Sequence, residues 1–272
     1  MCNVLNVSRS GFYQYLKRSE SERTKRKKRL TKRIVQIFES SRKLYGSPKI
    51  TRLLNRQGER VAQKTVASIM RENQLRSRIV RKYKATTNSS HDHPVHDNRL
   101  NQTFIAERPG QVYMSDITYV STAEGWLYVA SVMDLYSRKI VGWSAGDRMT
   151  KELVLRALDQ AYARQRPKGS VLHHSDRGSQ YASVEYQKRL EKYNMVGSMS
   201  RKGNCYDNAC IESFHNTLKR ECVYLNKFQT RKAAHQTIFE YIEVFYNRQR
   251  IHSSIGYVSP HHYETMYEAR AS

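Results

Sequence analysis

The chain reads Val171-Leu-His-His-Ser-Asp176-Arg-Gly-Ser-Gln-Tyr181 at the point that decides its fold. Val171 and Leu172 end a short apolar run that follows Gly169, and this pattern predicts a buried strand. Asp176 is then expected just past the carboxyl end of that strand, where an exposed loop begins. Loops at such positions commonly carry functional side chains.

Two further acids are expected to join Asp176. Asp116 stands in the run Val112-Tyr-Met-Ser-Asp116-Ile-Thr-Tyr-Val120, which predicts a strand, and 59 residues separate it from Asp176. Another 35 residues separate Asp176 from Glu212, which lies in a segment whose apolar residues repeat at helical spacing. Glu212 and Lys219 share one face of that helix, two turns apart. The sequence therefore predicts three carboxylates brought together from two strands and one helix.

Three carboxylates at close quarters raise one another's pKa values, so they stay ionised together only beside a cation. Oxygen ligands that leave room for water and phosphate suit Mg²⁺ or Mn²⁺. Two such ions would stabilise the attacking and leaving oxygens of an in-line phosphoryl displacement. The set predicts a metal-dependent enzyme that cuts and joins phosphodiester bonds.

The charge of the chain is strongly positive and uneven. Its 48 Lys and Arg residues face 24 Asp and Glu residues, a net charge of +24 over 272 residues. Residues 1–100 hold 25 basic and 7 acidic residues, whereas residues 101–272 hold 23 and 17. Such a balance favours a polyanionic partner, so the front third is expected to bind double-stranded DNA.

Cysteine usage and hydropathy point to the cytoplasm. The four cysteines form neither a CxxC pair nor a disulfide framework, which fits a reducing compartment; they are Cys2, Cys205, Cys210 and Cys222. No apolar run approaches the roughly 18 residues of a membrane span, and no secretory leader is evident. We expect a cytoplasmic protein that acts where DNA is.

Residues 1–75 are expected to form an all-helical DNA-binding region. Ser8 caps a short first helix, and a charged run over 20–33 leads into a second. Ser47-Pro48 predicts a helix start, with Ser47 as the cap and a helix over 47–56. After a turn at Gly58, residues 62–71 predict another helix, so 47–72 resembles a helix-turn-helix. The predicted DNA contacts of this second helix are Gln63, Lys64, Ser68 and Arg71.

Residues 76–103 are polar and basic without apolar periodicity, which predicts a linker. Its histidines, His91, His93 and His96, have no cysteine nearby, so a zinc site is the weaker interpretation.

Residues 104–222 predict a catalytic core. Three strands, over 111–120, 126–133 and 138–145, precede alternating helices and strands, an order that indicates an α/β fold of the ribonuclease-H type. Thr150 is expected to cap the first of these helices. Asp134 ends the second strand and is expected to be a turn carboxylate rather than a ligand. Residues 223–272 predict a helical extension whose main helix runs from Thr230 to Arg248.

Several polar residues near the acids are expected to contact the DNA backbone, because arginine, hydroxyl and amide groups make most such contacts. They are Arg177, Ser179, Gln180, Lys202, Asn208, Lys219 and Arg250.

Ordered motifs over nearly the whole chain resemble the transposases of the bacterial insertion-sequence IS-three family, of the second-reading-frame type, whose core resembles retroviral integrase. The motifs are Ser115-Asp116-Ile-Thr-Tyr119, Gly125-Trp-Leu-Tyr128, Asp134-Leu-Tyr-Ser-Arg138, Val141-Gly-Trp143, His174-Ser-Asp-Arg-Gly-Ser-Gln-Tyr181, Ser198-Met-Ser-Arg-Lys-Gly203, Asp207-Asn-Ala209, Glu212-Ser-Phe214 and Tyr246-Asn-Arg-Gln-Arg-Ile-His-Ser253. Tyr113 and Ile255 depart from the family pattern, which usually has tryptophan and leucine there.

The resemblance implies that Asp116, Asp176 and Glu212 are the catalytic triad of metal ligands. It also implies strand transfer at the ends of a mobile element, action as a multimer, and an upstream-frame protein that is often fused by frameshifting. Because the sequence starts at Met1 just before the Ser8 helix, we expect it to be the second-frame product alone and to bind element ends poorly by itself.

Two other functions remain open at this point. A non-catalytic DNA-binding regulator of transposition needs the basic front third but not the acids. A metal-dependent nuclease of the same fold cuts DNA without joining it.

Overall fold

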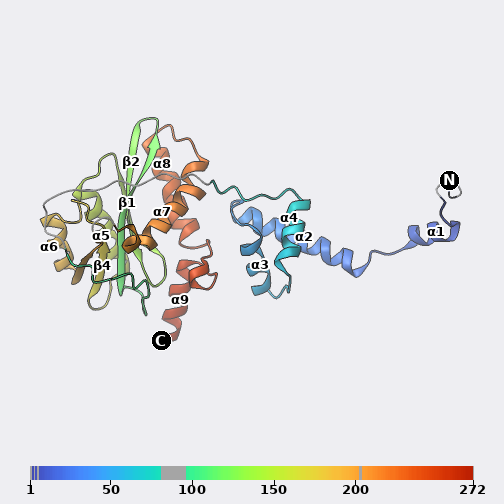
Figure 1. Cartoon of the computed structure of the whole chain (residues 1–272), viewed down its shortest axis with the longest axis horizontal. Helices are drawn as coiled ribbons and strands as arrows, with labels where there is room; N and C mark the ends of the chain where they lie inside the picture. The colour runs from blue at the N-terminus through green and yellow to red at the C-terminus, as the bar shows by residue number, and fades with distance from the viewer. Residues whose placement is uncertain (1, 3, 5, 81–95, 202–203, 272) are drawn as a thin grey trace. The chain divides into compact units, whose positions relative to one another are not determined.

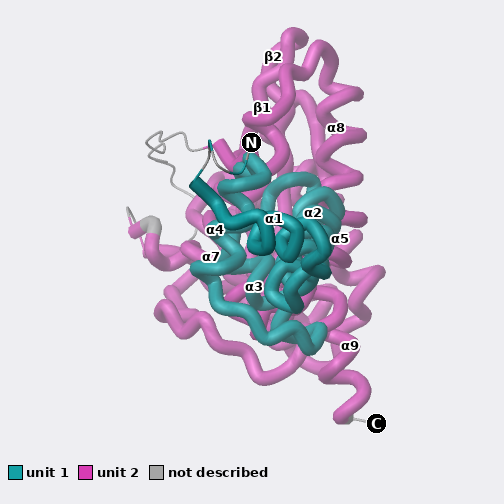
Figure 2. The backbone as a smooth tube through the Cα atoms, turned by 90° about the vertical axis from the view of Figure 1, so that its right-hand side faces the viewer, with its two compact units in different colours: residues 1–77 teal, residues 78–272 magenta. Residues whose placement is uncertain are grey.

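The computed structural model describes residues 2, 4, 6–80, 96–201 and 204–271. It divides into two compact units, residues 1–77 and 78–272 (Figure 2). The helices of the N-terminal unit are α1 (Arg9–Lys17), α2 (Glu22–Ser40), α3 (Ser47–Arg56) and α4 (Gln63–Glu72) (Figure 1). Ser8 caps α1 as predicted, since its hydroxyl accepts a hydrogen bond from the Gly11 amide at 3.0 Å.

The core of the N-terminal unit is made by α2, α3 and α4. Ile34 of α2, Leu54 of α3 and Val66 of α4 have no exposed surface, because the apolar residues of each helix recur on one face. The basic run of α2 lies in solvent, where Lys27 pairs with Glu72 of α4 at 2.7 Å. The predicted charged helix is therefore present with its apolar face buried.

The connection between α3 and α4 is a short ordered turn. Gly58 has φ of +87°, a conformation that glycine adopts without strain. The side chain of Asn55 accepts from the Val61 amide at 2.9 Å and donates to the Val61 carbonyl at 3.3 Å. One detail of the sequence prediction is wrong: Gly46 occupies the cap of α3, and Ser47 is its first residue.

A five-stranded mixed sheet forms the centre of the second unit, in the order β3-β2-β1-β4-β5. β1 runs antiparallel to β2 and β2 to β3, whereas β1, β4 and β5 are parallel neighbours. The strands are β1 (Val112–Thr122), β2 (Gly125–Asp134), β3 (Ile140–Gly146), β4 (Val171–Ser175) and β5 (Met195–Met199). The predicted strand order of a ribonuclease-H-like fold is thus present.

Helices cover both faces of the sheet (Figure 1). α5 (Lys151–Gln165) and α6 (Val184–Lys192) lie on one side and bury the core of the unit. α5 comes close to β3 at Gly142, where a Cβ atom would lie 2.1 Å from the Ala157 carbonyl oxygen. Thr150 takes the predicted position before α5, and Ser183 caps α6 through the Tyr186 amide.

The opposite face carries α7 (Ala209–Glu221) and α8 (Arg231–Phe239) (Figure 1). α7 is preceded by the 3₁₀ turn η1 (Cys205–Asn208) and followed by η2 (Val223–Leu225). The predicted helix from Thr230 to Arg248 consists of two types of helix. The α-helix α8 continues directly as the π-helix η3 (Glu240–Tyr246). The sequence pattern does not distinguish these two windings.

The C-terminal extension docks on the edge strand β3. The Asn247 side chain accepts from the Ile140 amide and donates to the Ile140 carbonyl, both at 2.9 Å. It thereby pairs polar groups that an edge strand otherwise leaves open. The turn η4 (Ser253–Ile255) and α9 (Pro260–Ala271) follow. α9 was not predicted, although Ser259-Pro260 is a typical helix start, and the Ser259 hydroxyl accepts from the His262 amide.

The predicted linker is shorter than expected on its C-terminal side. The amides of Arg99 and Leu100 donate to the Ser198 hydroxyl of β5, and Leu100 is buried. His96 contacts Gln187 of α6. His91 and His93 lie outside the described residues. Within the part of the chain that the structure describes, no helix is long and apolar enough to cross a membrane.

Candidate active site

Asp116 is fixed near the middle of β1, where it pairs across the sheet with Ser131 of β2. Its side chain is 18% exposed. One carboxylate oxygen accepts from the Ile117 amide at 2.8 Å, and the other lies 3.2 Å from Nδ1 of His215 on α7. The carboxylate is therefore held at the surface of the sheet by a backbone donor and an imidazole.

The strand register brings Asp176 beside Asp116. β1 and β4 are parallel, and Ser115 pairs with Ser175. Asp116 is the next residue of β1, and Asp176 is the first residue after the end of β4, so the two acids follow a pair of directly adjacent residues. Asp176 turns out of β4, and its Oδ1 accepts from the Gly178 amide at 2.9 Å.

Glu212 reaches the same place from the first turn of α7. Burial raises the pKa of Glu212, and the negative charges of Asp116 and Asp176 raise it further. The second cause requires the three carboxylates to be close in space. The structure thus brings together the three acids that the sequence selected.

The two histidines before Asp176 support the strand from within. His173 lies 2.9 Å from the Ser115 hydroxyl and 3.0 Å from the Tyr186 hydroxyl, and burial lowers its pKa to about 3. His174 lies between the hydroxyls of Ser198 and Ser200, and burial lowers its pKa to about 4. Both rings are neutral at pH 7, so they act as hydrogen-bonding parts of the core.

Asp134 has the turn role that the sequence predicts. One carboxylate oxygen accepts from the amide and the hydroxyl of Ser137, and the other accepts from the Gly110 amide at 2.9 Å. All of these partners belong to the loops beside the strand end, so Asp134 closes the turn after β2.

The donor set suits a hard divalent cation. Besides the three carboxylates, the hydroxyl of Tyr181 and Oδ1 of Asn208 are buried without a hydrogen-bond partner in the described part of the chain. The charges of Asp116 and Asp176 contribute to raising the pKa of Tyr181, after burial and Tyr186, which places its ring near the acids. A cation would offset the repulsion that raises the pKa of Glu212, and oxygen donors are those that Mg²⁺ and Mn²⁺ prefer.

The side chains are nevertheless not arranged as a finished metal site. Among the described residues, no group of three or more His, Cys, Asp or Glu side chains is placed to hold one ion as it stands. Asp116 and Asp176 instead accept from His215 and from backbone amides. Binding a cation would therefore require these carboxylates to exchange such partners for the ion.

Known proteins share both units of the chain. Models described as "Integrase core domain" match residues 106–205 and 212–267, and one described as "HTH-like domain" matches residues 25–83. The transposase InsF for insertion sequence IS3A of Escherichia coli (strain K12) is 43% identical over 266 residues, which are 97% of this chain and 92% of that relative. The chain belongs to this transposase family.

Other relatives agree with that membership. A 31 kDa protein of insertion element IS600 from Shigella sonnei is 45% identical to the present chain over the full length of both. Among solved structures, a chain of the simian T-cell lymphotropic virus intasome, in complex with a PP2A regulatory subunit, has a TM-score of 0.50 at 14% identity. The match covers 85% of this chain and 74% of that one, and it confirms the integrase-like fold alone.

The transposase exposes its predicted contacts in the N-terminal unit. On α4, Val66, Ile69 and Met70 face the core. The exposed face of the helix carries the side chains predicted to contact DNA: Gln63, Lys64, Ser68 and Arg71. Ser68 donates to Glu72 at 3.2 Å, so one of the four already has an acidic neighbour.

Contacts predicted around the acids are placed less uniformly. Ser179 is exposed, and Nε of Arg177 donates to the Ser200 carbonyl at 2.7 Å. Gln180 donates to the Met149 carbonyl at 3.0 Å, and the Lys219 ammonium lies 4.6 Å from the centre of the Tyr119 ring. Lys202 lies outside the described residues.

Two predicted DNA contacts are corrected by burial. Arg250 is 8% exposed and forms a bidentate ion pair with Glu221, at 2.7 and 2.8 Å. Asn208 is 3% exposed and donates to the Ser115 carbonyl at 3.4 Å. Each side chain therefore serves the fold around the site, because its polar atoms point into the protein. A basic or amide residue in a motif does not by itself reveal which way its side chain points.

His215 is the site residue that sequence reasoning missed. It contacts Asp116 through Nδ1, and its Nε2 lies 3.4 Å from the Ser131 hydroxyl. The signal was present, because His215 stands three residues after Glu212, a spacing that places both on one helix face.

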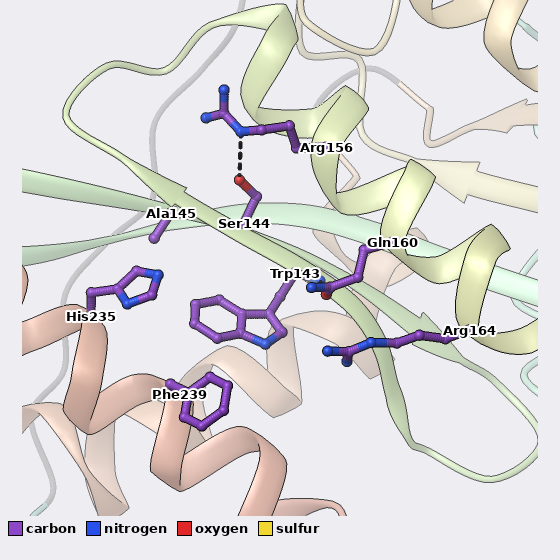
Figure 3. A pocket seen from close by; sticks show the side chains of 8 residues that line it. All are labelled: Trp143, Ser144, Ala145, Arg156, Gln160, Arg164, His235 and Phe239. Atoms are coloured by element: carbon purple, nitrogen blue, oxygen red, sulfur yellow. Dashed lines mark hydrogen bonds between the residues drawn. The ribbon is translucent and has the colours of Figure 1, made fainter.

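A separate cavity of about 460 Å³ lies at the β3 edge, between α5 and α8 (Figure 3). Trp143 forms its floor, with Arg156 and Arg164 on one side and His235 and Phe239 on the other (Figure 3). None of the side chains that line it is a carboxylate. The cavity is thus distinct from the acids.

Proposed function

We propose that Asp116, Asp176 and Glu212 are the catalytic residues with which this transposase cuts phosphodiester bonds at insertion-sequence ends and joins the freed 3′ ends to target DNA. The observation that carries the proposal is the strand register. It pairs Ser115 with Ser175, the residues just before Asp116 and Asp176, and the charges of both acids contribute to raising the pKa of Glu212. The strongest alternative is a non-catalytic DNA-binding regulator, which would not need these acids.

Asp116 and Asp176 would hold two Mg²⁺ or Mn²⁺ ions, and Glu212 would complete one of the two sites. Such ions, when bound, activate the attacking oxygen and stabilise the leaving one. The protein supplies the fixed positions. β1 carries Asp116, the loop that follows β4 carries Asp176, and the first turn of α7 carries Glu212.

The remaining roles concern DNA. Arg177, Ser179 and Gln180 follow Asp176 in the chain and Lys219 follows Glu212 on α7; all four would bind phosphate and sugar groups, since side chains of these types make most backbone contacts. The exposed face of α4 would enter the major groove through Gln63, Lys64, Ser68 and Arg71. Lys202 is proposed as a further contact from the sequence alone.

Cutting two element ends and joining them requires both ends to be held together, so the working form is proposed to be a multimer of this chain. An upstream-frame partner or fusion would add recognition of the terminal repeats. The protein would act in the bacterial cytoplasm, at the nucleoid. An isolated chain that binds the repeats as selectively as a fused form would contradict the need for that partner.

The test is strand transfer by the purified full-length chain on pre-cut duplexes that carry the element's own ends, with Mg²⁺ or Mn²⁺. Wild type should give joined products, and Asp116→Asn, Asp176→Asn and Glu212→Gln should give none while still binding DNA. Cleavage without joining would indicate a nuclease. Full biological effect of Asp116→Asn would indicate the regulator.

A further inference from the structure

Two aromatic side chains are exposed on the β1–β2 hairpin, close to the proposed active site. Tyr119 is 39% exposed and Trp126 is 45% exposed. Their ring centres are 5.1 Å apart, with an angle of 83° between the ring planes. The Lys219 ammonium lies 4.6 Å from the centre of the Tyr119 ring. Single exposed aromatic residues are ordinary, but a cluster with a cation beside catalytic groups requires an explanation.

The elements that carry the acids also carry this cluster. Tyr119 follows Asp116 by three residues on β1, and Lys219 follows Glu212 by seven residues on α7. In the described part of the chain, β4 pairs with β1 only over residues 112–115. Between Ser115 and Thr122, which forms a bridge with Phe228, that edge of β1 pairs with no other described strand, and the Lys219 ammonium lies over the Tyr119 ring.

The hairpin that presents Trp126 is fixed to the protein. The Ala123 amide donates to the Phe228 carbonyl at 3.0 Å, and Thr122 forms a bridge with the same residue. Nε of Arg231 donates to the Trp126 carbonyl at 3.0 Å. The aromatic rings are thus held in place before any ligand arrives, which lowers the entropic cost of binding to them.

We propose that Tyr119, Trp126 and Lys219 form a stacking platform for an unpaired base of the DNA strand that runs through the active site. This inference rests on the proposed function, because the platform is placed relative to its carboxylates. Exposed aromatic faces bind bases of any sequence by stacking, and a nearby cation holds the adjoining phosphate.

Tyr119 and Asp116 lie on opposite faces of β1, because side chains alternate along a strand, so the DNA strand would pass around the edge of β1 to reach the rings. Two lengths along the elements give the spacing. Three residues of a strand and seven residues of a helix each span about 10 Å. Successive nucleotides of one strand are about 3.4 Å apart along a duplex axis. The platform therefore takes a base roughly two or three nucleotides from the phosphate at the carboxylates, which implies that the duplex is opened over that distance.

The test uses the full chain and synthetic 20-base-pair duplexes, either blunt or with single-stranded tails of one to five thymidines at the 3′ or 5′ end. Affinity is measured in Ca²⁺ in place of Mg²⁺. Stacking of one base typically changes affinity about tenfold. Wild type should therefore bind tails of two or three nucleotides about tenfold more tightly than blunt DNA. A 2-aminopurine at the second or third tail position should lose fluorescence on binding.

Paired variants separate stacking from mere apolar surface. Trp126→Phe and Tyr119→Phe keep a ring and should keep the preference for tails, whereas Trp126→Leu and Tyr119→Leu should lose it. Phe239→Leu is the matched control, because Phe239 is 49% exposed on α8 and should not affect tail binding. If one leucine variant fails to fold, the pair at the other position decides.

The outcomes for the platform and for the proposed function are distinguishable. Equal affinity of wild type for tailed and blunt DNA overturns the platform. A preference for tailed DNA that both leucine variants retain overturns it as well. Neither result bears on whether the chain carries out strand transfer. A ring-dependent preference for tails in a chain that never joins DNA would support the platform and contradict the proposed function.

Discussion

The two units of the transposase use basic residues in different ways. Residues 1–77 hold 20 basic and 5 acidic residues, and residues 78–272 hold 28 and 19. In the first unit, Lys64 and Arg71 stand exposed on α4. In the second, Arg250 is buried against Glu221. A basic side chain is thus exposed at these positions of the first unit and buried in an ion pair at Arg250 of the second, and the larger share of acids in the second unit is the sequence feature that accompanies the difference.

The largest expected effect is the loss of strand transfer, without loss of DNA affinity, when a proposed catalytic acid is substituted. Asp116→Asn should lower strand transfer by at least about 10³-fold, which corresponds to about 4 kcal/mol, because an amide cannot hold a cation as a carboxylate does. Affinity for DNA should remain near that of wild type, since α4 is untouched. Rates from a gel assay and affinities from anisotropy would check this. Loss of strand transfer together with DNA affinity would show that catalysis and DNA binding are not separated between the two units.

Arg250→Ala should lower the free energy of unfolding by about 3–5 kcal/mol, because it leaves the Glu221 charge buried without its partner. The measurement is urea unfolding of the full chain. The double variant Arg250→Met with Glu221→Gln should regain much of the loss, since no buried charge remains. If Arg250 instead contacts DNA, Arg250→Ala would weaken DNA binding and leave stability unchanged.

Glu212→Gln should stabilise the metal-free protein at pH 7.5 by less than about 1 kcal/mol. The pKa of Glu212 is raised by burial and by Asp116 and Asp176, so its ionised form destabilises the fold. The sign follows from linkage: the folded state binds this proton more tightly, so the cost appears as pH rises through the folded pKa and vanishes at low pH.

Thermal melting at pH 7.5 and pH 4 would measure that difference. Glu185→Gln is the matched control, because the Lys151 hydrogen bond lowers the pKa of Glu185 and the substitution should not stabilise. Added Mg²⁺ should raise the melting temperature of wild type more than that of Glu212→Gln. A variant that is less stable than wild type at pH 7.5 without metal would contradict the electrostatic description of the site.

The smallest effects are expected in the N-terminal unit. Lys64→Ala and Arg71→Ala should each reduce the slope of log affinity against log salt by about 0.9, the value for one lost phosphate contact. The loss of affinity between 50 and 200 mM salt then becomes roughly threefold smaller. Lys43→Ala serves as the control, because Lys43 pairs with Glu39 at 3.4 Å. An unchanged slope for both α4 variants would remove that helix from the DNA interface.

Much of the fold was predictable because local patterns determined it. Apolar runs bounded by turns predicted the strands, and Ser8 caps a helix where expected. The three acids could be selected from the sequence because a strand, the end of a second strand and a helix face limit where a carboxylate can lie; their role stays a prediction. The family and the fold class, which the sequence motifs also predicted, are confirmed by the matching integrase core model and the transposase relative.

Other features depend on contacts between distant residues. The partner of Arg250 is Glu221, 29 residues away, and nothing local distinguishes this arginine from an exposed one. The π-helix η3 has an ordinary amphipathic sequence, and the contacts of Glu243 with Arg164 and of Asn247 with Ile140 join residues 79 and 107 positions apart. His215 was visible on the Glu212 face, but its partner Asp116 lies 99 residues away.

The central claim is that Asp116 and Asp176 ligate the catalytic cation, and metal-specific rescue tests it most directly. A thiolate binds Mg²⁺ poorly and accepts softer ions. We expect Asp116→Cys and Asp176→Cys to be inactive in strand transfer with Mg²⁺ and to regain activity with Mn²⁺, while wild type works with both. Wild-type activity of either cysteine variant in Mg²⁺, or equal inactivity in both metals, would contradict the claim.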